Sequence, residues 1–590
     1  MAGGLLNLIA VGNANLFLTG DPTKTFFRST YSKHTNFGLQ KFRIDYTGTR
    51  DLRLTEPSVF TFKIPRYAEL LMDTYLVVTL PNIWSPIYPP IKKIINPSDG
   101  SVLNAESNTN NKWVPYEFRW IQDLGTQMIQ EIEIRCGSFT LARYSGDYIS
   151  AAVDRDQTEE KKKAFREMTG NVDDLHDPAF ANGRDNTYPN AFYVDSASGV
   201  EPSIRGRDLY IPLNTWFGTD TRSSFPLIAL QYNELEISVK MRPIQDLFQV
   251  RDVCDVDSEG NTYSYPYIRP DFNKERFHMY RFLQSPLKEK IYIATDLAGN
   301  YPSEKAFSEK DLPLNYGYPD PDAYQNSVNI WNADIHLLST YAFLSKEETR
   351  QLAQEDQIYL VKEVFTYKFD NIYGSKKVKL ESNGMVANWM WYFQRNDANM
   401  RNEWSNYTNW PYRILPSDVQ NAPPSLVLNP PDNGISYNTG FFISGGFNVE
   451  NQKQIMLSMG IVLDGKYREN TLPRGVFDYI EKYARTNGFA KEGIYCYQFG
   501  LETNPHQCQP SGAINLGKFK NIELEFVTFI PQIDTTNSSY DIFCNTAGEG
   551  AAVNKNNWRL YEYTYNLVMF EERYNILSFV GGTCGMLYAR

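Results

Sequence analysis

The chain has 590 residues, of which 42% are hydrophobic and 22% are charged, and its formal net charge is -11. This length exceeds what one hydrophobic core supports, so two large domains or several small ones are expected. The acidic balance argues against direct binding of nucleic acid, because gripping phosphates needs a concentrated excess of Lys and Arg. No run of eighteen apolar residues occurs, which argues against a membrane-spanning segment.

Residues 1–24 make an apolar leading arm, in which Leu5, Leu8 and Ile9 can share one face of a short helix. An arm this short has no core of its own, so we expect it to dock on the body of the protein, on a neighbouring subunit or on something beneath it. No Lys or Arg precedes Lys24, which makes the arm a poor secretory signal. Six cysteines in so long a chain do not make a disulfide framework, so a reducing compartment is favoured.

Strand patterns dominate the first half of the chain. Phe60, Phe62 and Ile64 alternate with polar residues until Pro65 ends the pattern. The clearest helix in this half is expected at 156–168. Strands separated by long loops rich in Pro, Gly, Asn and Asp favour a β-sandwich over βαβ units.

One strand pattern occurs twice. Residues 233–243 read NELEISVKMRP, and residues 521–531 read NIELEFVTFIP. Both run from an Asn to a Pro over the same spacing and alternate apolar with polar residues, although their Leu-Glu pairs are offset by one position. The repetition indicates one all-β unit built twice.

The middle of the chain changes character. Residues 249–328 are rich in Asp, Tyr, Pro and Gly without a sustained period, so we expect a long connection or exposed loops. Strand patterns resume at 330–343, and Ser345 and Glu348 then form a capping box that predicts the start of a helix. Further strands are expected at 376–380, 389–393, 454–463 and 560–570.

One acidic loop resembles a calcium site. Asp255, Asp257, Glu259 and Gly260 copy the start of an EF-hand loop, but Pro266 stands where the bidentate Glu belongs. A solvated acidic loop is therefore favoured.

Two further groups could suggest metal or carboxylate chemistry. Cys496, His506 and Cys508 match no zinc template and lack a fourth ligand. Four glutamates invite comparison with the paired carboxylates of glycosidases, but their alternation with apolar residues indicates the wet side of strands: Glu234, Glu236, Glu523 and Glu525. No catalytic residue, cofactor site or metal site is predicted.

Glycans and sugar stacking are the remaining candidates. Asn406 and Asn537 satisfy the glycosylation sequon, and a cytosolic route would leave both bare. Four tryptophans could stack on sugars, but packing in a core or subunit interface is the commoner use: Trp389, Trp391, Trp404 and Trp410. A strand with Trp389 and Trp391 on one face would bury both.

Several stretches, taken in order, resemble the major capsid proteins of the nucleocytoplasmic large DNA viruses, most closely those of mimivirus-like giant viruses. The resemblance lies in MAGGLLNLIAVG, LFLTGDPTKTFF, FKIPRYAELL, YLVVTLP and SSFPLIALQYNELEI in the first half, and in LSTYAFLSKEETRQLAQ, WMWYFQRND, QPSGAINLGKF and YNILSFVGGTCGMLYAR in the second. It spans essentially the whole chain. Ser32 and Lys33 stand where relatives often carry two arginines, and Asn15 where an acidic residue is common.

The resemblance implies an all-β chain of two tandem eight-stranded antiparallel jelly-roll sandwiches with long loops and few short helices. The expected parts are an arm at 1–24, a first jelly roll at 25–248, a connection at 249–328 and a second jelly roll at 329–590. Leu5, Leu6, Leu8 and Ile9 are the expected assembly residues of the arm.

The implied function is that of a major capsid protein without cofactor or catalytic role. Its expected partners are two further copies in a homotrimer, neighbouring capsomers, and minor capsid proteins reached by the arm and inner face. It would reside in the virion shell after assembly in the host cytoplasm. A competing hypothesis is a two-domain β-sandwich that binds carbohydrate or cleaves glycosides.

Overall fold

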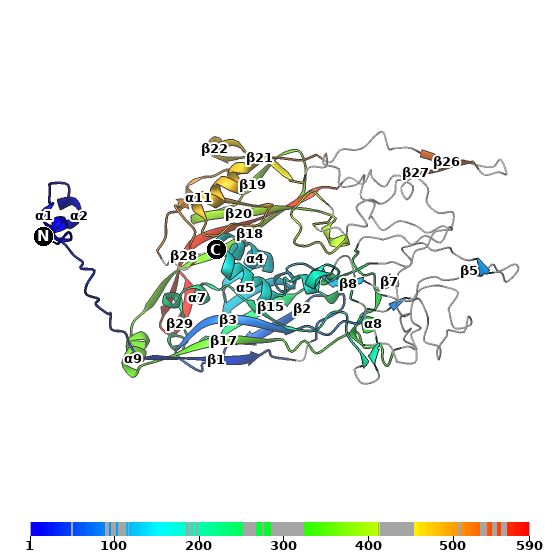
Figure 1. Cartoon of the computed structure of the whole chain (residues 1–590), viewed down its shortest axis with the longest axis horizontal. Coiled ribbons are helices and arrows are strands. Elements are labelled where there is room, and N and C mark those ends of the chain that lie inside the picture. Colours follow the sequence, from blue (N-terminus) through cyan, green and yellow to red (C-terminus); the bar gives the residue numbers. More distant parts are fainter. Residues whose placement is uncertain are drawn as a thin grey trace.

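A computed structural model of the chain describes residues 2–48, 51–85, 87–88, 94–95, 102–103, 114–115, 117–184, 188–189, 193–195, 199–251, 267–273, 277–284, 324–410, 412–413, 453–505, 509–530, 540–544, 551–555 and 563–588. The predicted all-β fold with two tandem antiparallel jelly-roll sandwiches is confirmed. Figure 1 shows the two sandwiches on either side of a small group of helices.

The first sandwich packs a sheet of order β1-β17-β3-β13, with β14 beside β3, against a sheet of order β10-β9-β15-β2. The bounds of these strands are β1 Phe37–Asp45, β2 Ser58–Lys63, β3 Leu70–Thr79, β9 Ile129–Cys136, β10 Phe139–Tyr144, β13 Asp208–Pro212, β14 Phe225–Pro226, β15 Leu235–Met241 and β17 His336–Leu344.

The second sandwich packs a sheet of order β18-β28-β20-β23, with β24 beside β20 and β29 beside β28, against a sheet of order β19-β25-β21-β22. The bounds are β18 Gln357–Ile372, β19 Ser375–Leu380, β20 Met385–Arg395, β21 Met456–Leu463, β22 Lys466–Pro473, β23 Ile494–Gln498, β24 Ile514–Asn515, β25 Ile522–Thr528, β28 Tyr565–Val580 and β29 Thr583–Met586.

Short strand pairs and helices lie outside these sheets. The pairs are β4 Ile87–Tyr88 with β7 Val114–Pro115, β5 Ile94–Ile95 with β6 Val102–Leu103, β8 Glu117–Trp120 with β16 Phe248–Arg251, β11 Tyr193–Asp195 with β12 Gly199–Val200, and β26 Tyr540–Cys544 with β27 Ala551–Lys555. The α-helices are α1 Leu5–Ile9, α2 Leu16–Thr19, α3 Leu124–Gln127, α4 Gly146–Asp156, α5 Glu159–Thr169, α6 Asp173–His176, α7 Trp216–Thr219, α8 Tyr280–Leu283, α9 Lys346–Gln354 and α11 Glu481–Arg485. Single turns are η1 Ala181–Gly183, η2 Thr221–Ser223, η3 Leu227–Ala229, η4 Ile244–Asp246, η8 Ala398–Met400, η10 Leu516–Lys518 and the π-helical η9 Val476–Ile480.

The predicted internal repeat is visible in the strand order. Reading each sheet from the same edge, β10-β9-β15-β2 corresponds to β22-β21-β25-β19, so the repeated segments β15 and β25 occupy the same position. Both strands are seven residues long and alternate buried with more exposed side chains. Leu235 and Ile522 each begin their strand, so the two Leu-Glu pairs start at strand positions one and three, and their leucines lie on the same buried face.

β17 moves the division between the sandwiches away from the expected residue 329. It pairs with β1 and β3 of the first sandwich, where Leu338 lies opposite both Arg43 and Tyr75. The physical reason is the jelly-roll connection, in which the last strand returns to the middle of the sheet that holds the first strand, as β28 does in the second sandwich. The chain therefore crosses to the second sandwich after β17, through α9.

The predicted capping box at the start of α9 is confirmed. Ser345 is the N-cap, and its side chain accepts a hydrogen bond from the backbone N–H of Glu348 at 3.4 Å. This contact satisfies one of the N–H groups that lack a partner within the helix.

Parts of the expected connection at 249–328 pack into the first sandwich. Phe277, Met279 and Phe282 are fully buried in its core. These described stretches are therefore not exposed loops, although the Asp255–Pro266 loop lies outside the described residues.

The helix expected at 156–168 begins later. Asp156 is the last residue of α4, and Gln157 is extended, so α5 starts at Glu159. Helix α4, which the sequence analysis missed, lies between the two sandwiches (Figure 1).

Candidate assembly surfaces

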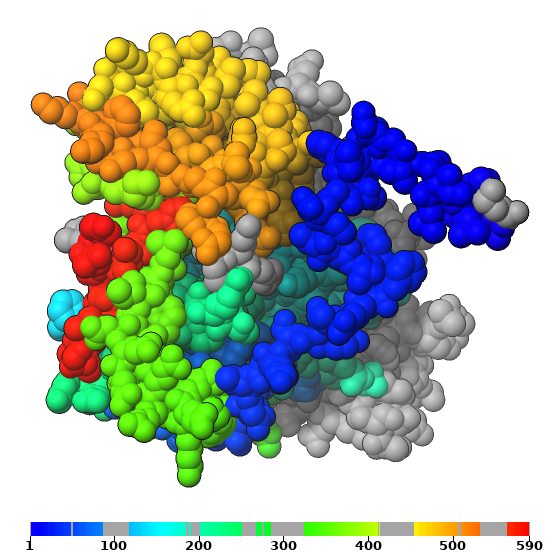
Figure 2. Space-filling view, turned by 90° about the vertical axis from the view of Figure 1, so that its left-hand side faces the viewer, coloured from blue at the N-terminus to red at the C-terminus, as the bar shows by residue number. Residues whose placement is uncertain are grey.

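The leading arm stands out from the packed body (Figure 2). It carries α1 and α2, and the side chains of Leu5, Leu6, Leu8 and Ile9 are all exposed. Phe17 in α2 is 93% exposed. A contiguous apolar surface left open to solvent marks an interaction site rather than a stable free segment.

Helix α4 carries a buried ionic network from one sandwich to the other. The Arg155 guanidinium donates to Glu572 Oε1 at 2.7 Å, to Asn388 Oδ1 at 2.8 Å and to Asp156 Oδ2 at 2.6 Å. The Tyr148 hydroxyl donates to the same Glu572 oxygen at 3.0 Å. Burial alone would raise the pKa of Glu572, but the charges of Arg155 and Lys362 and the hydrogen bonds from Asn388 and Arg155 hold that pKa at about 2. We call this contact region between the sandwiches the seam.

Backbone and ionic contacts extend the seam beyond α4. Lys491 Nζ lies 2.6 Å from Asp123 Oδ2, and the backbone N–H of Gly488 donates to Arg155 O at 2.7 Å. A Cβ at Gly488 would lie 2.3 Å from Gln157 O, so only glycine allows this close approach.

The apolar core of the first sandwich continues across the seam. The Tyr148 ring packs edge-on against Phe570 at 5.5 Å between centroids, and Phe225 packs against Phe579 at 5.1 Å. The buried cluster that holds Phe225 also includes Phe570 and Phe579 of the second sandwich. Shared packing and paired charges make the two sandwiches one body.

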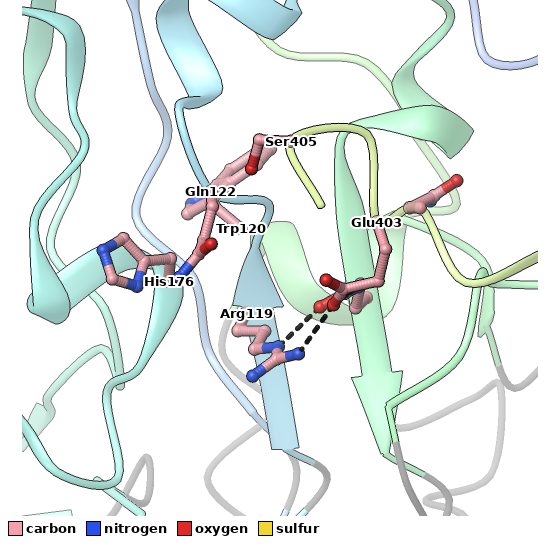
Figure 3. Close-up of a pocket in the computed structure, with 8 residues that line it drawn as sticks. Arg119, Trp120, Gln122, His176, Glu403 and Ser405 are labelled. Carbon is pink, nitrogen blue, oxygen red and sulfur yellow. Dashed lines mark hydrogen bonds and ion pairs between the residues drawn. The ribbon is translucent and has the colours of Figure 1, made fainter. Parts of the chain in front are cut away.

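A small polar cleft opens where the first sandwich meets the segment after β20 (Figure 3). Arg119 donates to Gln249 Oε1 at 2.5 Å and to Glu403 Oε1 at 3.4 Å. Burial lowers the pKa of His176 to about 4, so this histidine is neutral at pH 7. The residues lining the cleft include one carboxylate, Glu403, which already pairs with Arg119. A retaining or inverting glycosidase needs a second carboxylate beside it.

Of the glutamates compared with glycosidase residues, Glu236, Glu523 and Glu525 lie on the solvent faces of β15 and β25, as the alternation predicts. Glu234 is exposed and directly precedes β15. Lys63 pairs with Glu234 at 3.5 Å and with Glu236 at 3.8 Å, and Lys377 pairs with Glu523 and Glu525. The hydrogen bond from Lys377 lowers the pKa of Glu525. This direction is opposite to the raised pKa that a general acid needs.

The structure argues against a glycan at Asn406. Asn406 is 4% exposed, its amide donates to Trp410 O at 2.9 Å, and its carbonyl accepts from Thr408 Oγ1 at 2.7 Å. The folded chain leaves no room for a glycan there. Asn537 lies outside the described residues.

Where the structure describes them, the tryptophans and the suggested metal ligands are packed within the protein. Trp389 and Trp391 are buried together in the second core, as predicted. Trp404 donates its ring N–H to Asp246 O at 3.0 Å. Cys496 is a buried free thiol, whereas His506 and Cys508 lie outside the described residues. Within the described part of the chain no helix is long and apolar enough to cross a membrane, and no three metal-binding side chains gather.

Comparison with known proteins agrees with this architecture. Residues 25–266 match the family described as major capsid protein N-terminus, and residues 348–585 match large eukaryotic DNA virus major capsid protein. The chain is similar to the major capsid protein of Phaeocystis pouchetii virus, with 24% identity over 99% of both chains. It is also similar to probable capsid protein 4 of Acanthamoeba polyphaga mimivirus, with 23% identity over 89% of this chain and 92% of the relative.

Among solved structures, the chain resembles the subunit in a quasi-atomic model of the PBCV-1 virus capsid. The TM-score is 0.54 at 15% identity, covering 96% of this chain and 100% of that one. Two tandem sandwiches of equal strand order, joined by a buried seam, define a viral double jelly-roll protein. The chain belongs to the major capsid proteins of large eukaryotic DNA viruses. Its place is the capsid shell of the virion.

Proposed function

We propose that three copies of the chain close into a homotrimeric capsomer with a six-cornered outline, and that these capsomers tile the icosahedral shell. The observation that carries the proposal is the matching strand order of the two sandwiches. Three chains supply six similar wedges, and a cyclic trimer needs only one type of heterologous interface. The tile would act mechanically, without catalysis or a cofactor, and be assembled in the host cytoplasm.

The seam supports a mechanical role. Arg155 and Glu572 are both nearly inaccessible to solvent, and their pairing fixes α4 against β20 and β28. Separating a buried pair leaves a buried charge without its partner, which is costly. The pair therefore resists a change in the angle between the two sandwiches. A rigid angle suits a subunit that must tile a flat facet.

The leading arm suits contacts outside the trimer. Its helices are separated from the sandwiches, and they contain no charged side chain. A charge-free apolar segment fits an apolar groove on a minor capsid protein or a neighbouring capsomer at the inner side of the shell. The seam and the arm would then divide the work, with the body forming trimers and the arm joining them to the shell.

Deletion of residues 1–24 tests this division. We expect trimers of unchanged mass by light scattering but a marked loss of shells by electron microscopy. A sharper pair of variants changes charge alone: Leu6→Asp with Leu8→Asp should impair shells, whereas Asn7→Asp with Asn13→Asp should not. Loss of trimers on deletion would refute the division.

The competing function, carbohydrate binding or glycoside cleavage, predicts a different behaviour in solution. A monomer retained on a polysaccharide column would support it, and a trimer that passes through unretained would oppose it. The single carboxylate of the cleft and the lowered pKa of Glu525 favour the capsid function.

A further inference from the structure

The helix at 474–485, which we call the outer helix, is the counterpart of α4. It comprises η9 and α11 with the two preceding helical residues, and it follows the β21–β22 hairpin as α4 follows the β9–β10 hairpin. Ile149 and Phe477 are each the fourth residue of their helix, and each is fully buried in the core of its own sandwich. The two helices therefore dock on their own sandwiches in the same way.

The outer helix has apolar side chains on its exposed side as well as on its buried side. Its inner side holds an ion pair between Lys482 Nζ and Asp478 Oδ1 at 2.6 Å, and both side chains are almost inaccessible. Its outward side is apolar and open: Tyr479 and Ile480 are about half exposed, and Tyr483 is 89% exposed. A surface helix normally turns its apolar side inward. An exposed cluster that contains two tyrosines is typical of a protein–protein interface.

The matching side of α4 shows what such a surface contacts. Counted from the helix start, Tyr483 corresponds to Arg155, and Ile480 corresponds to Ala152. On α4 this side is covered by the second sandwich, through the Arg155–Glu572 contact. Within the described residues the corresponding side of the outer helix stays largely open, and Tyr483 is the most exposed side chain on it. In Figure 1, α4 lies between the sandwiches and α11 lies at the outside of the second one.

We propose that the outer helix docks on the first sandwich of a second copy of this chain, repeating between copies the seam that α4 makes within one. This inference rests on the proposed trimer and assigns its contact surface. The receiving surface is the solvent face of β3 and β17, the counterparts of β20 and β28. Tyr75 and Leu338 form a part-exposed cross-strand pair on that face.

The internal repeat indicates that the outer helix docks on a second copy of this chain. Within the chain, the helix after the hairpin of one sandwich covers the sheet of the next sandwich. The sandwich that follows the second one in a closed ring is the first sandwich of another copy. Three chains then have three seams within chains and three between chains, and no outer helix remains open.

Charged substitutions on the outer helix test the contact. Ile480→Asp with Tyr483→Asp should weaken trimerisation by roughly thirtyfold or more, which is the effect of losing a hot-spot aromatic. Tyr373→Asp is the control, because Tyr373 is also largely exposed but lies in the turn between β18 and β19. Sedimentation over a concentration series gives the mass, and circular dichroism with thermal unfolding checks the fold.

The outcomes separate this inference from the proposed function. Trimers of wild type and Tyr373→Asp, with folded monomers of the double variant, support the inference. A double variant that trimerises like wild type overturns the inference and leaves the trimer proposal standing. A wild-type monomer at every concentration overturns both.

Cross-linking between copies gives an independent test of the receiving surface. Tyr483→Cys and Leu338→Cys chains, tagged differently and co-expressed, should form a disulfide-linked heterodimer under mild oxidation with oxidised glutathione. Wild type, in which Cys136, Cys496 and Cys584 are buried, provides the background. No heterodimer above that background would contradict docking on β3 and β17.

Discussion

The seam and the solvent faces of the sheets both contain ion pairs, but they use them differently. On the solvent face, Lys63 is 56% exposed and spans two glutamates at 3.5 and 3.8 Å. In the seam, Arg155 is 1% exposed and Glu572 is 2% exposed, and their charges meet at 2.7 Å. Water screens the charges on the solvent face, whereas burial keeps water away from the charges in the seam.

This difference separates solubility from rigidity. The surface pairs let the sheets face water without large apolar patches, and each can be lost at little cost. The seam pairs fix how the two sandwiches lie against each other, because an unpaired buried charge is too costly to tolerate. The assembly function depends on the seam.

Arg155→Ala should give the largest effect. It leaves Glu572 buried without its guanidinium partner, and we expect the free energy of unfolding to fall by about 3–5 kcal/mol. Urea unfolding followed by fluorescence measures this. Asp154→Ala, on the same helix but outside the Arg155 hydrogen bonds, is the control. A loss below about 1 kcal/mol at Arg155 would mean that the seam is solvated.

His176, which lines the polar cleft, makes the fold sensitive to acid. Burial lowers its pKa to about 4, while Asp173 and Asp123 oppose this shift and Arg119 and Arg413 add to it. The unfolded chain binds the proton near pH 6.5 and the folded chain does not, so this contribution is present above pH 6.5 and is lost as the pH falls towards 4. The loss should reach about 3 kcal/mol.

The check on His176 is the pH dependence of urea unfolding between pH 7 and 4. His176→Gln removes the titrating group, so the variant should show a shallower loss over that window. If the free energy of unfolding falls equally with pH in wild type and variant, His176 does not cause the acid sensitivity.

Lys63→Ala should give the smallest effect. Its two pairs are exposed on the solvent face, so the free energy of unfolding should change by less than about 1 kcal/mol. High salt should leave the variant and wild type alike. If Lys63→Ala lowered the free energy of unfolding as much as Arg155→Ala, the ion pairs of the solvent face and of the seam would not differ in the way described.

Local patterns that repeat along one strand or helix were readable from the sequence. The alternation in 233–243 and 521–531 predicts strands β15 and β25, and Ser345 with Glu348 predicts the start of α9. These signals are local, so they need no knowledge of what packs on the segment.

Features decided by distant contacts were missed. Helix α4 is covered on both sides, so it lacks the apolar stripe that marks a helix at a surface. β17 was placed in the wrong sandwich because its pairing with β1 and β3 depends on chain topology. The burial of Asn406 depends on a local turn that a three-residue sequon does not report. The exposed apolar side of the outer helix left a signal in the sequence, because Tyr479, Ile480 and Tyr483 recur at helical spacing. Only their exposure in the structure shows that this side is open.

The most direct test of the central claim is the mass and outline of the purified full-length protein, measured by light scattering and electron microscopy on one sample. The account predicts particles of three times 68.0 kDa with three-fold symmetry and six corners. Monomers of 68.0 kDa at every concentration, or particles with two-fold symmetry, would contradict it.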